Sequence, residues 1–277
     1  MAVTATAATV LHMQDYLESS RIYRLLTREA GVISVVARGV RRGGKRATTP
    51  PDLFAGGVAQ VDLREGRDLH GLREFELTVP RLGLSSALSR FSAAGAVAEV
   101  ALRFIPAEPT DTATVVVEDG LDALNVVAPE RADDLALGVL WRLVAALGLA
   151  PTIRSCALCG IAVDERSAEL LPFHHRSGGV VCLSCAAPLS RHGSRQIPGA
   201  RSLPGTARRT LHDWIEGPAA TVRPEPLSAA EVTAHQRLLR EFLTEHLTER
   251  RDLRAYLSWE GDRAHTTPRS DDGSVPR

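Results

Sequence analysis

The first 80 residues alternate between apolar and polar positions in the manner of β-strands. In the last of the predicted strands, Phe75, Leu77 and Val79 should face one side and the polar residues between them the other. The sequence Glu29-Ala30-Gly31 predicts a hairpin turn. Five short strands in about 80 residues predict a small barrel, of either the OB or the SH3-like type. The apolar stretches that define these strands are Thr9–Leu11, Ile22–Thr27, VISVVAR from Val32, VAQVDL and REFELTV.

From Ser85 onward the apolar positions recur with the period of a helix, up to Pro106. Further helices are predicted over 112–127 and 132–147, and the latter is apolar nearly all round, so it should be the central buried helix. Ser228 and Glu231 form a capping box that begins a late helix. The pattern therefore predicts a barrel domain over 1–80, an α-helical domain over 81–260, and a disordered tail over 261–277.

The 277 residues carry 33 basic and 33 acidic side chains, and the formal net charge is zero. Because Lys45 is the only lysine beside 32 arginines, the number of arginines reflects base composition and only their placement is informative. Residues 19–46 are strongly basic, and residues 188–209 hold five arginines and no acid. We expect the latter stretch to be either a solvated linker or an extension of a basic surface. The acidic residues of 108–134 are expected to form a solvated helix face.

The chain shows neither a signal peptide nor an apolar segment of about 20 residues, the length that a membrane span needs. We therefore expect a cytoplasmic protein without membrane contact. In a reducing compartment, paired cysteines favour metal binding over disulfides.

All four cysteines belong to Cys-x-x-Cys pairs, each of which places two thiolates at adjacent corners of a tetrahedral ion. The 22 residues between the pairs slightly exceed the usual spacing of about 15 to 20. The pattern predicts a structural Zn²⁺ site with four cysteine ligands; a site with a histidine ligand and a metal-free set are the alternatives. His174 and His175 are expected to be surface loop residues. The predicted ligands are Cys156, Cys159, Cys182 and Cys185.

A dense cluster of cations follows the third predicted strand and is interleaved with glycines. Flexible backbone with positive charge suits a phosphate chain, and on an OB barrel this loop would border the nucleic-acid-binding face. Because the predicted barrel has only four aromatic residues, binding is expected to be mainly electrostatic and steeply salt-dependent. A solvated arginine-rich loop is the alternative. The cluster consists of Arg38, Arg41, Arg42, Lys45 and Arg46.

Five segments carry a resemblance to a known family: QDYLESSRIYRLLTREAGVISVVARGVRR (14–42), GRDLHGLREFEL (66–77), LGLAPTIRSCALCG (147–160), GGVVCLSC (178–185) and LREFLTEHL (239–247). Together, in this order, they resemble the RecO family of bacterial DNA repair proteins, from residue 10 to about residue 258. Where that family often has Gly-Glu-Ser-Asp, this chain has Leu17-Glu18-Ser19-Ser20, so the turn should be built differently.

The resemblance implies an N-terminal OB fold followed by an α-helical domain with a zinc-bound insertion. It implies a recombination mediator rather than an enzyme, which binds single- and double-stranded DNA, anneals complementary strands, contacts single-stranded-DNA-binding protein (SSB), and with RecR helps load RecA. It also implies a nucleoid-associated location in the cytoplasm. The metal role falls on the four cysteines. The DNA-contacting role falls on Arg21, Arg24, Arg38, Arg41, Arg42, Lys45 and Arg46.

Two other classes of function compete with this interpretation. A zinc hydrolase or deaminase needs a general base and an open metal position, and the His-x-Glu segment of deaminases is missing. An OB-fold and zinc-ribbon adaptor for RNA or the transcription machinery shares the same composition. Preference for folded RNA and lack of annealing would favour the adaptor.

Overall fold

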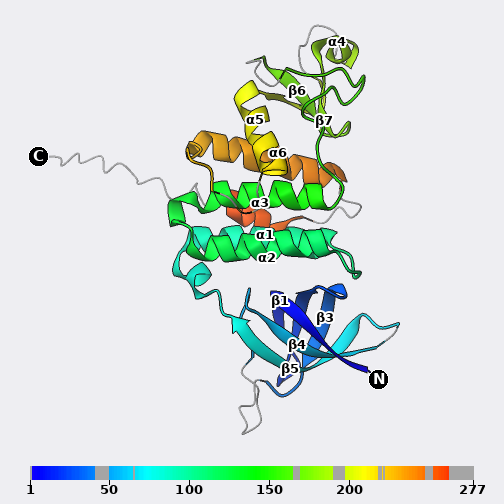
Figure 1. Cartoon of the computed structure of the whole chain (residues 1–277), viewed down its shortest axis with the longest axis vertical. Coiled ribbons are helices and arrows are strands. Elements are labelled where there is room, and N and C mark those ends of the chain that lie inside the picture. Colours follow the sequence, from blue (N-terminus) through cyan, green and yellow to red (C-terminus); the bar gives the residue numbers. More distant parts are fainter. Residues whose placement is uncertain are drawn as a thin grey trace, which may run out of the picture.

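The chain is built from three parts that follow one another along its long axis (Figure 1). A computed structural model describes residues 2–40, 50–64, 66–164, 169–189, 197–217, 220, 222–246 and 252–261. The barrel lies at one end, helices form the middle layers, and the segment with the cysteines lies at the other end. The predicted disordered tail falls outside the described residues, apart from Gly261. No helix in the described part of the chain has both the length and the apolar character to cross a membrane.

Five strands close into a barrel in the order β1-β2-β3-β5-β4. Only β3 and β5 pair in parallel, and the other neighbours are antiparallel. A five-stranded barrel of this kind is the OB fold, which confirms that prediction. The strands are β1 (Ala2–Tyr16), β2 (Ser20–Thr27), β3 (Gly31–Ala37), β4 (Gly56–Leu63) and β5 (Leu69–Val79).

The barrel interior is filled by side chains from all five strands, including Tyr23 and Phe75. The prediction that Leu77 and Val79 share the buried side of Phe75 is wrong, because they are 52% and 37% exposed. Their partners in β4 are Gly57 and Gly56, which have no side chain to cover them. The end of β5 therefore leaves the interior although its sequence continues the pattern.

Helices make up most of the second part, and the central one is buried on nearly all sides as predicted. In this helix, α3 (Ala132–Ala146), ten of fifteen residues are buried, among them Leu137, Leu140 and Trp141. Ser228 and Glu231 form the predicted capping box, because each backbone N–H donates to the other residue's side chain. The other long helices are α1 (Leu88–Phe104), α2 (Asp111–Val126), α5 (Gly205–Glu216), α6 (Ala229–His246) and α7 (Arg254–Gly261).

Beside its own interior cluster, the barrel contributes residues to the hydrophobic core of the helices. Leu11, Leu26 and Phe54 of the barrel belong to the same buried cluster as the helices. At Gly31 (φ 60°) the backbones approach so closely that a Cβ would lie 2.1 Å from the carbonyl oxygen of Pro106. The Val32 N–H donates to that same oxygen at 3.1 Å. The barrel is thus packed against the helices rather than tethered to them.

Two acidic side chains of α2 face the barrel. Glu118 accepts hydrogen bonds from Thr9 at 3.4 Å and Arg28 at 3.5 Å, and Asp122 accepts one from Arg81 at 2.6 Å. Residues four apart lie on the same side of a helix, so both carboxylates reach the junction together. The expectation of a solvated acidic face is therefore wrong for Glu118, whereas Asp122 remains exposed although it is ion-paired with Arg81.

Candidate metal centre and nucleic-acid interface

The first cysteine pair lies on a tight turn that the backbone shapes. The Gly160 N–H donates to the Cys156 carbonyl at 2.8 Å, and Gly160 has a φ of 73°, which glycine adopts without strain. The N–H of Cys156 donates to the Ile161 carbonyl at 2.8 Å. Both thiols of the pair are therefore presented on one side of the turn.

The second pair is positioned by a short helix, α4 (Leu183–Ala186), which follows β7 (Gly179–Val180) in the chain. β7 forms a small sheet with β6 (Leu171–His174) and β8 (Ala200–Leu203). Cys182 occupies the N-cap of α4 and Cys185 lies within its single turn. The Ala157 N–H donates to the Val180 carbonyl at 2.8 Å, and this bond links the turn of the first pair to β7.

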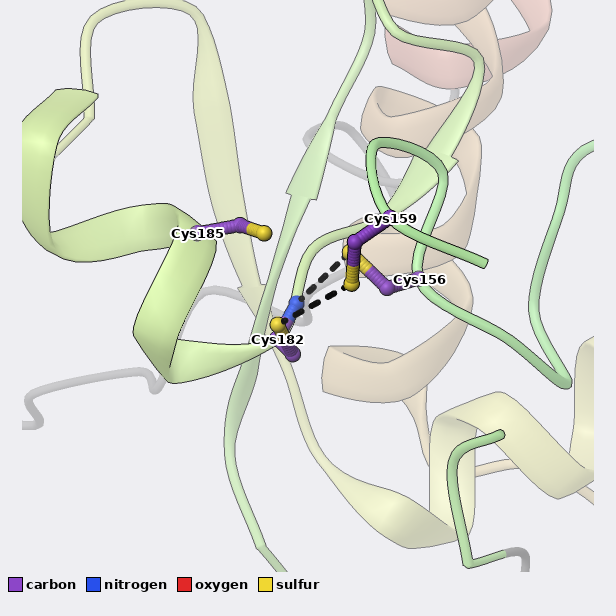
Figure 2. A group of neighbouring side chains, drawn as sticks. All are labelled: Cys156, Cys159, Cys182 and Cys185. Atoms are coloured by element: carbon purple, nitrogen blue, oxygen red, sulfur yellow. Dashed lines mark hydrogen bonds between the residues drawn. The ribbon is translucent and has the colours of Figure 1, made fainter. Parts of the chain in front are cut away.

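The four sulfur atoms converge on a common centre (Figure 2). All four lie within 4.8 Å of one another, and the Cys159 and Cys182 sulfurs are 3.8 Å apart. Sulfurs bound about 2.3 Å from a tetrahedral ion are separated by about 3.8 Å, so the observed spacing matches such a site closely. This cluster of the predicted ligands Cys156, Cys159, Cys182 and Cys185 could hold a metal ion.

The protonation of these thiols also fits a cation site. Burial raises the pKa of Cys156, but the N–H groups of Cys182, Cys159 and Leu158 outweigh it and lower this pKa to about 6. Hydrogen bonding with the neighbouring thiols of Cys159 and Cys182 raises the pKa of Cys185 to about 12. The Cys156 thiolate therefore forms readily and opposes the ionisation of the neighbouring thiols. A divalent cation would offset the repulsion between the negative charges, because all four ligands bind it as thiolates.

Neither histidine between the pairs belongs to this cluster of described residues. His174 Nδ1 lies 2.7 Å from the Ser177 hydroxyl, and His175 Nε2 lies 3.1 Å from the Glu241 carboxylate. His175 is buried, so the expectation that it is a surface loop residue is wrong. Burial lowers its pKa, although Glu241 opposes the shift.

The segment with the cysteines is anchored to α6 by apolar and ionic contacts. Phe173 packs edge-on against Phe242, with ring centroids 6.0 Å apart. Glu241 binds both His175 and the guanidinium of Arg201. The metal site therefore lies on a module that is docked against the helical core.

The three described arginines among the predicted DNA contacts lie in three different environments. Arg21 is paired with Asp15 at 3.0 Å, which raises the pKa of the guanidinium. Arg24 is half-buried and donates to the Leu102 carbonyl at 3.4 Å; burial, aided by the charge of Arg103, lowers its pKa. Arg38 is exposed and forms no ion pair with a described residue. The predicted DNA contacts Arg41, Arg42, Lys45 and Arg46 lie outside the described residues.

Register places Arg21 and Arg38 close together at one edge of the barrel. Arg21 is directly opposite Ala37 in the pairing of β2 with β3, and Arg38 is the next residue. Arg24 lies opposite Ser34, nearer to the helices. Of these three arginines, Arg21 and Arg38 thus lie at the same end of the barrel, and Arg24 is directed toward the end of α1.

The second arginine-rich stretch is not a free basic surface where the structure describes it. Arg201 is bound to Glu241, and Arg208 is buried and donates to the carbonyls of Asp164 and Glu169. Both the linker and the surface interpretation are therefore wrong for Arg208, whereas Arg201 lies in β8 and stays half-exposed with its charge paired to Glu241. Residues 191–196, which hold two more of the five arginines, lie outside the described residues.

Comparisons with known proteins agree with this architecture. Residues 1–81 match the family model described as recombination protein O N terminal, and residues 85–255 match recombination protein O C terminal. DNA repair protein RecO of Anaeromyxobacter dehalogenans is 34% identical over 249 residues, which span 90% of this chain and 93% of that protein. DNA repair protein RecO of a Nocardioides species is 29% identical over 254 residues, 90% of this chain and 97% of that protein. With both domains matched in order, the chain belongs to the RecO family.

Proposed function

We propose that this protein is a DNA-binding mediator of repair and homologous recombination. The observation that carries the proposal is the match of the barrel and the helical domain, in order, to both halves of the RecO family. The relatives that align over 90% of this chain are named DNA repair proteins. An OB barrel with a cluster of cations beyond β3 is a suitable framework for this role.

In this proposal the protein binds DNA mainly through contacts with its phosphates. The contact residues are Arg21, Arg24, Arg38, Arg41, Arg42, Lys45 and Arg46. Each cation that neutralises a phosphate releases condensed counterions, so affinity should fall steeply with salt. Phosphate contacts carry no sequence information, so the protein should bind single and double strands without strong sequence preference.

Annealing follows from the same chemistry. Two complementary strands repel each other through their phosphates, and a cationic surface screens this repulsion without occupying the base edges. The protein needs no reaction centre for this step, and we propose that it is not an enzyme. We further propose that it acts in the cytoplasm at the nucleoid, contacts SSB, and with RecR helps load RecA.

The metal in this proposal is a structural Zn²⁺ held by the four cysteines. A closed set of four thiolates leaves no open position for a substrate, so the ion orders the module rather than reacting. The sulfur cluster and the barrel lie at opposite ends of the molecule (Figure 1), which separates the ion from the proposed DNA contacts.

Binding to labelled oligonucleotides over a range of salt concentrations tests this proposal. We expect the protein to bind both a single strand and a duplex, with log affinity falling linearly with log salt. Replacing Arg38 with Gln should reduce the magnitude of the salt slope by about one, because the variant neutralises one phosphate fewer. Preference for folded RNA over both DNA forms would refute the proposal and favour the adaptor.

A further inference from the structure

The barrel displays one aromatic ring at its surface, at the end of β1. Tyr16 is 41% exposed, whereas Tyr23, Phe54 and Phe75, the other barrel aromatics, are buried. An exposed tyrosine that no core residue covers is free to contact a ligand through the face of its ring.

The pairing of the strands puts this ring beside a cation. Tyr16 lies opposite Ser20, one step beyond the row formed by Asp15, Arg21 and Ala37. Arg38 follows Ala37 directly, at the same end of the barrel as Tyr16 and just beyond the last paired residues of β2 and β3. Adjacent strands are about 4.8 Å apart, so these three neighbouring strand ends span about 10 Å. Arg38 is exposed, whereas Ser20 on the middle strand is buried.

The Tyr16 ring lies on the outside of the barrel. Tyr23 and Ala37 point into the interior cluster, and Arg21, two residues before Tyr23 in β2, points to the same side. Ser20 points to the opposite side of β2, as does Leu26, which packs against the helices. Tyr16 therefore belongs to the outer surface of the barrel, and Arg38 is exposed where the chain leaves β3 at the same end.

Leu17, the residue after Tyr16, is also exposed at the barrel surface. Leu17 is 73% exposed and has a φ of 53°, a left-handed conformation that disfavours a leucine. Neither burial nor backbone preference accounts for a large apolar side chain at this position. The turn therefore offers an aromatic and an aliphatic surface side by side.

The charges around the turn suit a nucleic acid strand. Arg21 neutralises Asp15 at 3.0 Å, and Arg38 forms no ion pair with a described residue. A phosphate bound near Arg38 would bring a base of the same strand within reach of the Tyr16 ring. The distance from a phosphate to a neighbouring base is similar to the distance that the side chains of Tyr16 and Arg38 span together. Only an unpaired base can expose its face for stacking, whereas the bases of a duplex are already stacked.

We propose that Tyr16 stacks on an unpaired base of single-stranded DNA whose phosphate is bound near Arg38, with Leu17 flanking that base. This inference rests on the proposed DNA-binding function and adds a contact that distinguishes single strands from duplexes. Stacking contributes binding free energy that does not depend on counterion release. It should therefore change the affinity without changing the slope of log affinity against log salt.

The test compares Tyr16→Ala, Tyr16→Phe and Arg38→Gln in the zinc-loaded full chain. Binding to a labelled oligo(dT) strand and to a duplex of equal length is measured by fluorescence anisotropy at several salt concentrations. We expect Tyr16→Ala to weaken single-strand binding by about 5- to 150-fold, the effect of unstacking one base. Its salt slope and its duplex affinity should stay unchanged, and Tyr16→Phe should bind like the wild type.

Two further variants make the result specific. Arg38→Gln should weaken both DNA forms and lower the salt slope, and Leu77→Ala, a change at another exposed apolar residue of the barrel, should have no effect. Single-strand affinity of Tyr16→Ala equal to that of the wild type, or equal reductions for strand and duplex, would overturn the stacking proposal. A wild-type protein that binds neither DNA form would instead overturn the proposed function itself.

Discussion

Arg81 and Asp122 form an ion pair across the junction of the barrel and the helices, with 2.6 Å between Nε and Oδ1. The Arg81 side chain is buried, and it also donates to the Phe54 carbonyl at 2.8 Å. Arg81 is separated from the end of β5 by Pro80 alone and has a φ of 45°. One side chain thus connects the end of the barrel, the loop before β4 that holds Phe54, and α2.

Replacing Arg81 with Ala should lower the free energy of unfolding by about 2 to 4 kcal/mol, because the buried Phe54 carbonyl loses its charged donor and a cavity forms. Urea denaturation measures this change. Asp122→Asn is the matched control. Since half of the Asp122 side chain is exposed, the control should cost about 1 kcal/mol or less. Equal costs for the two variants would contradict a role of Arg81 beyond the ion pair.

Removing a cysteine ligand should abolish metal binding and loosen the module at the far end of the molecule. Cys182→Ser is expected to reduce the bound Zn²⁺ to well below one ion per chain, since a closed site needs all four thiolates. Metal content by mass spectrometry and hydrogen exchange of the sheet around β6 measure the two effects. Exchange in the barrel should not change, and unchanged zinc content in the variant would refute the assignment of the site.

Stability should fall on acidification partly through His235. Burial, aided by the nearby charge of Arg223 and opposed by Glu231, lowers the pKa of this histidine to about 4. In the unfolded chain the pKa is about 6.5, so the unfolded state takes up the proton first as the pH falls. The contribution of neutral His235 is therefore complete above about pH 6.5 and is lost between pH 6.5 and 4, at no more than about 1.4 kcal/mol per pH unit.

The variant His235→Gln isolates this contribution. His175 also has a lowered pKa, so the informative quantity is the difference between the wild-type and variant stability curves. We expect the curve of the variant to be flatter between pH 6.5 and 4 and parallel to that of the wild type above pH 7. Parallel curves over the whole range would show that His235 does not titrate with a lowered pKa.

Arg208 and Arg209 should respond differently to the same change. Arg208 is buried and donates to two carbonyls, whereas Arg209 is exposed. Arg208→Gln is expected to cost about 2 to 3 kcal/mol of stability, and Arg209→Gln less than about 0.5 kcal/mol. Thermal or urea unfolding checks this order. DNA affinity that falls for Arg208→Gln at temperatures where the variant is fully folded would contradict its structural role.

Local patterns predicted the elements of this fold well. The hairpin at Gly31, the buried helix around Trp141 and the capping box at Ser228 depend on neighbouring residues, so the sequence contains the information needed to find them. The cysteine pairs could also be predicted from the sequence, because two Cys-x-x-Cys motifs are the pattern of a site with four cysteine ligands. The structure adds the distances that make the four sulfurs a single site.

Long-range contacts were the part that the sequence did not reveal. Leu77 continues the strand pattern but lies opposite a glycine, and the partner of a strand residue cannot be read from one strand. Glu118 and Asp122 look like solvated acids, although their spacing of four residues was a signal of a shared face. Tyr16, at the end of β1, is exposed, whereas the other three barrel aromatics are buried.

We propose that the barrel and its cations promote the pairing of DNA strands. The annealing rate of complementary oligonucleotides coated with SSB tests this role, for the wild type and a variant in which Arg38, Arg41, Arg42, Lys45 and Arg46 are replaced by Gln. We expect the wild type to accelerate annealing and the variant not to, since the variant no longer screens the phosphates. A wild-type protein that leaves the annealing rate unchanged, or a variant as fast as the wild type, would contradict it.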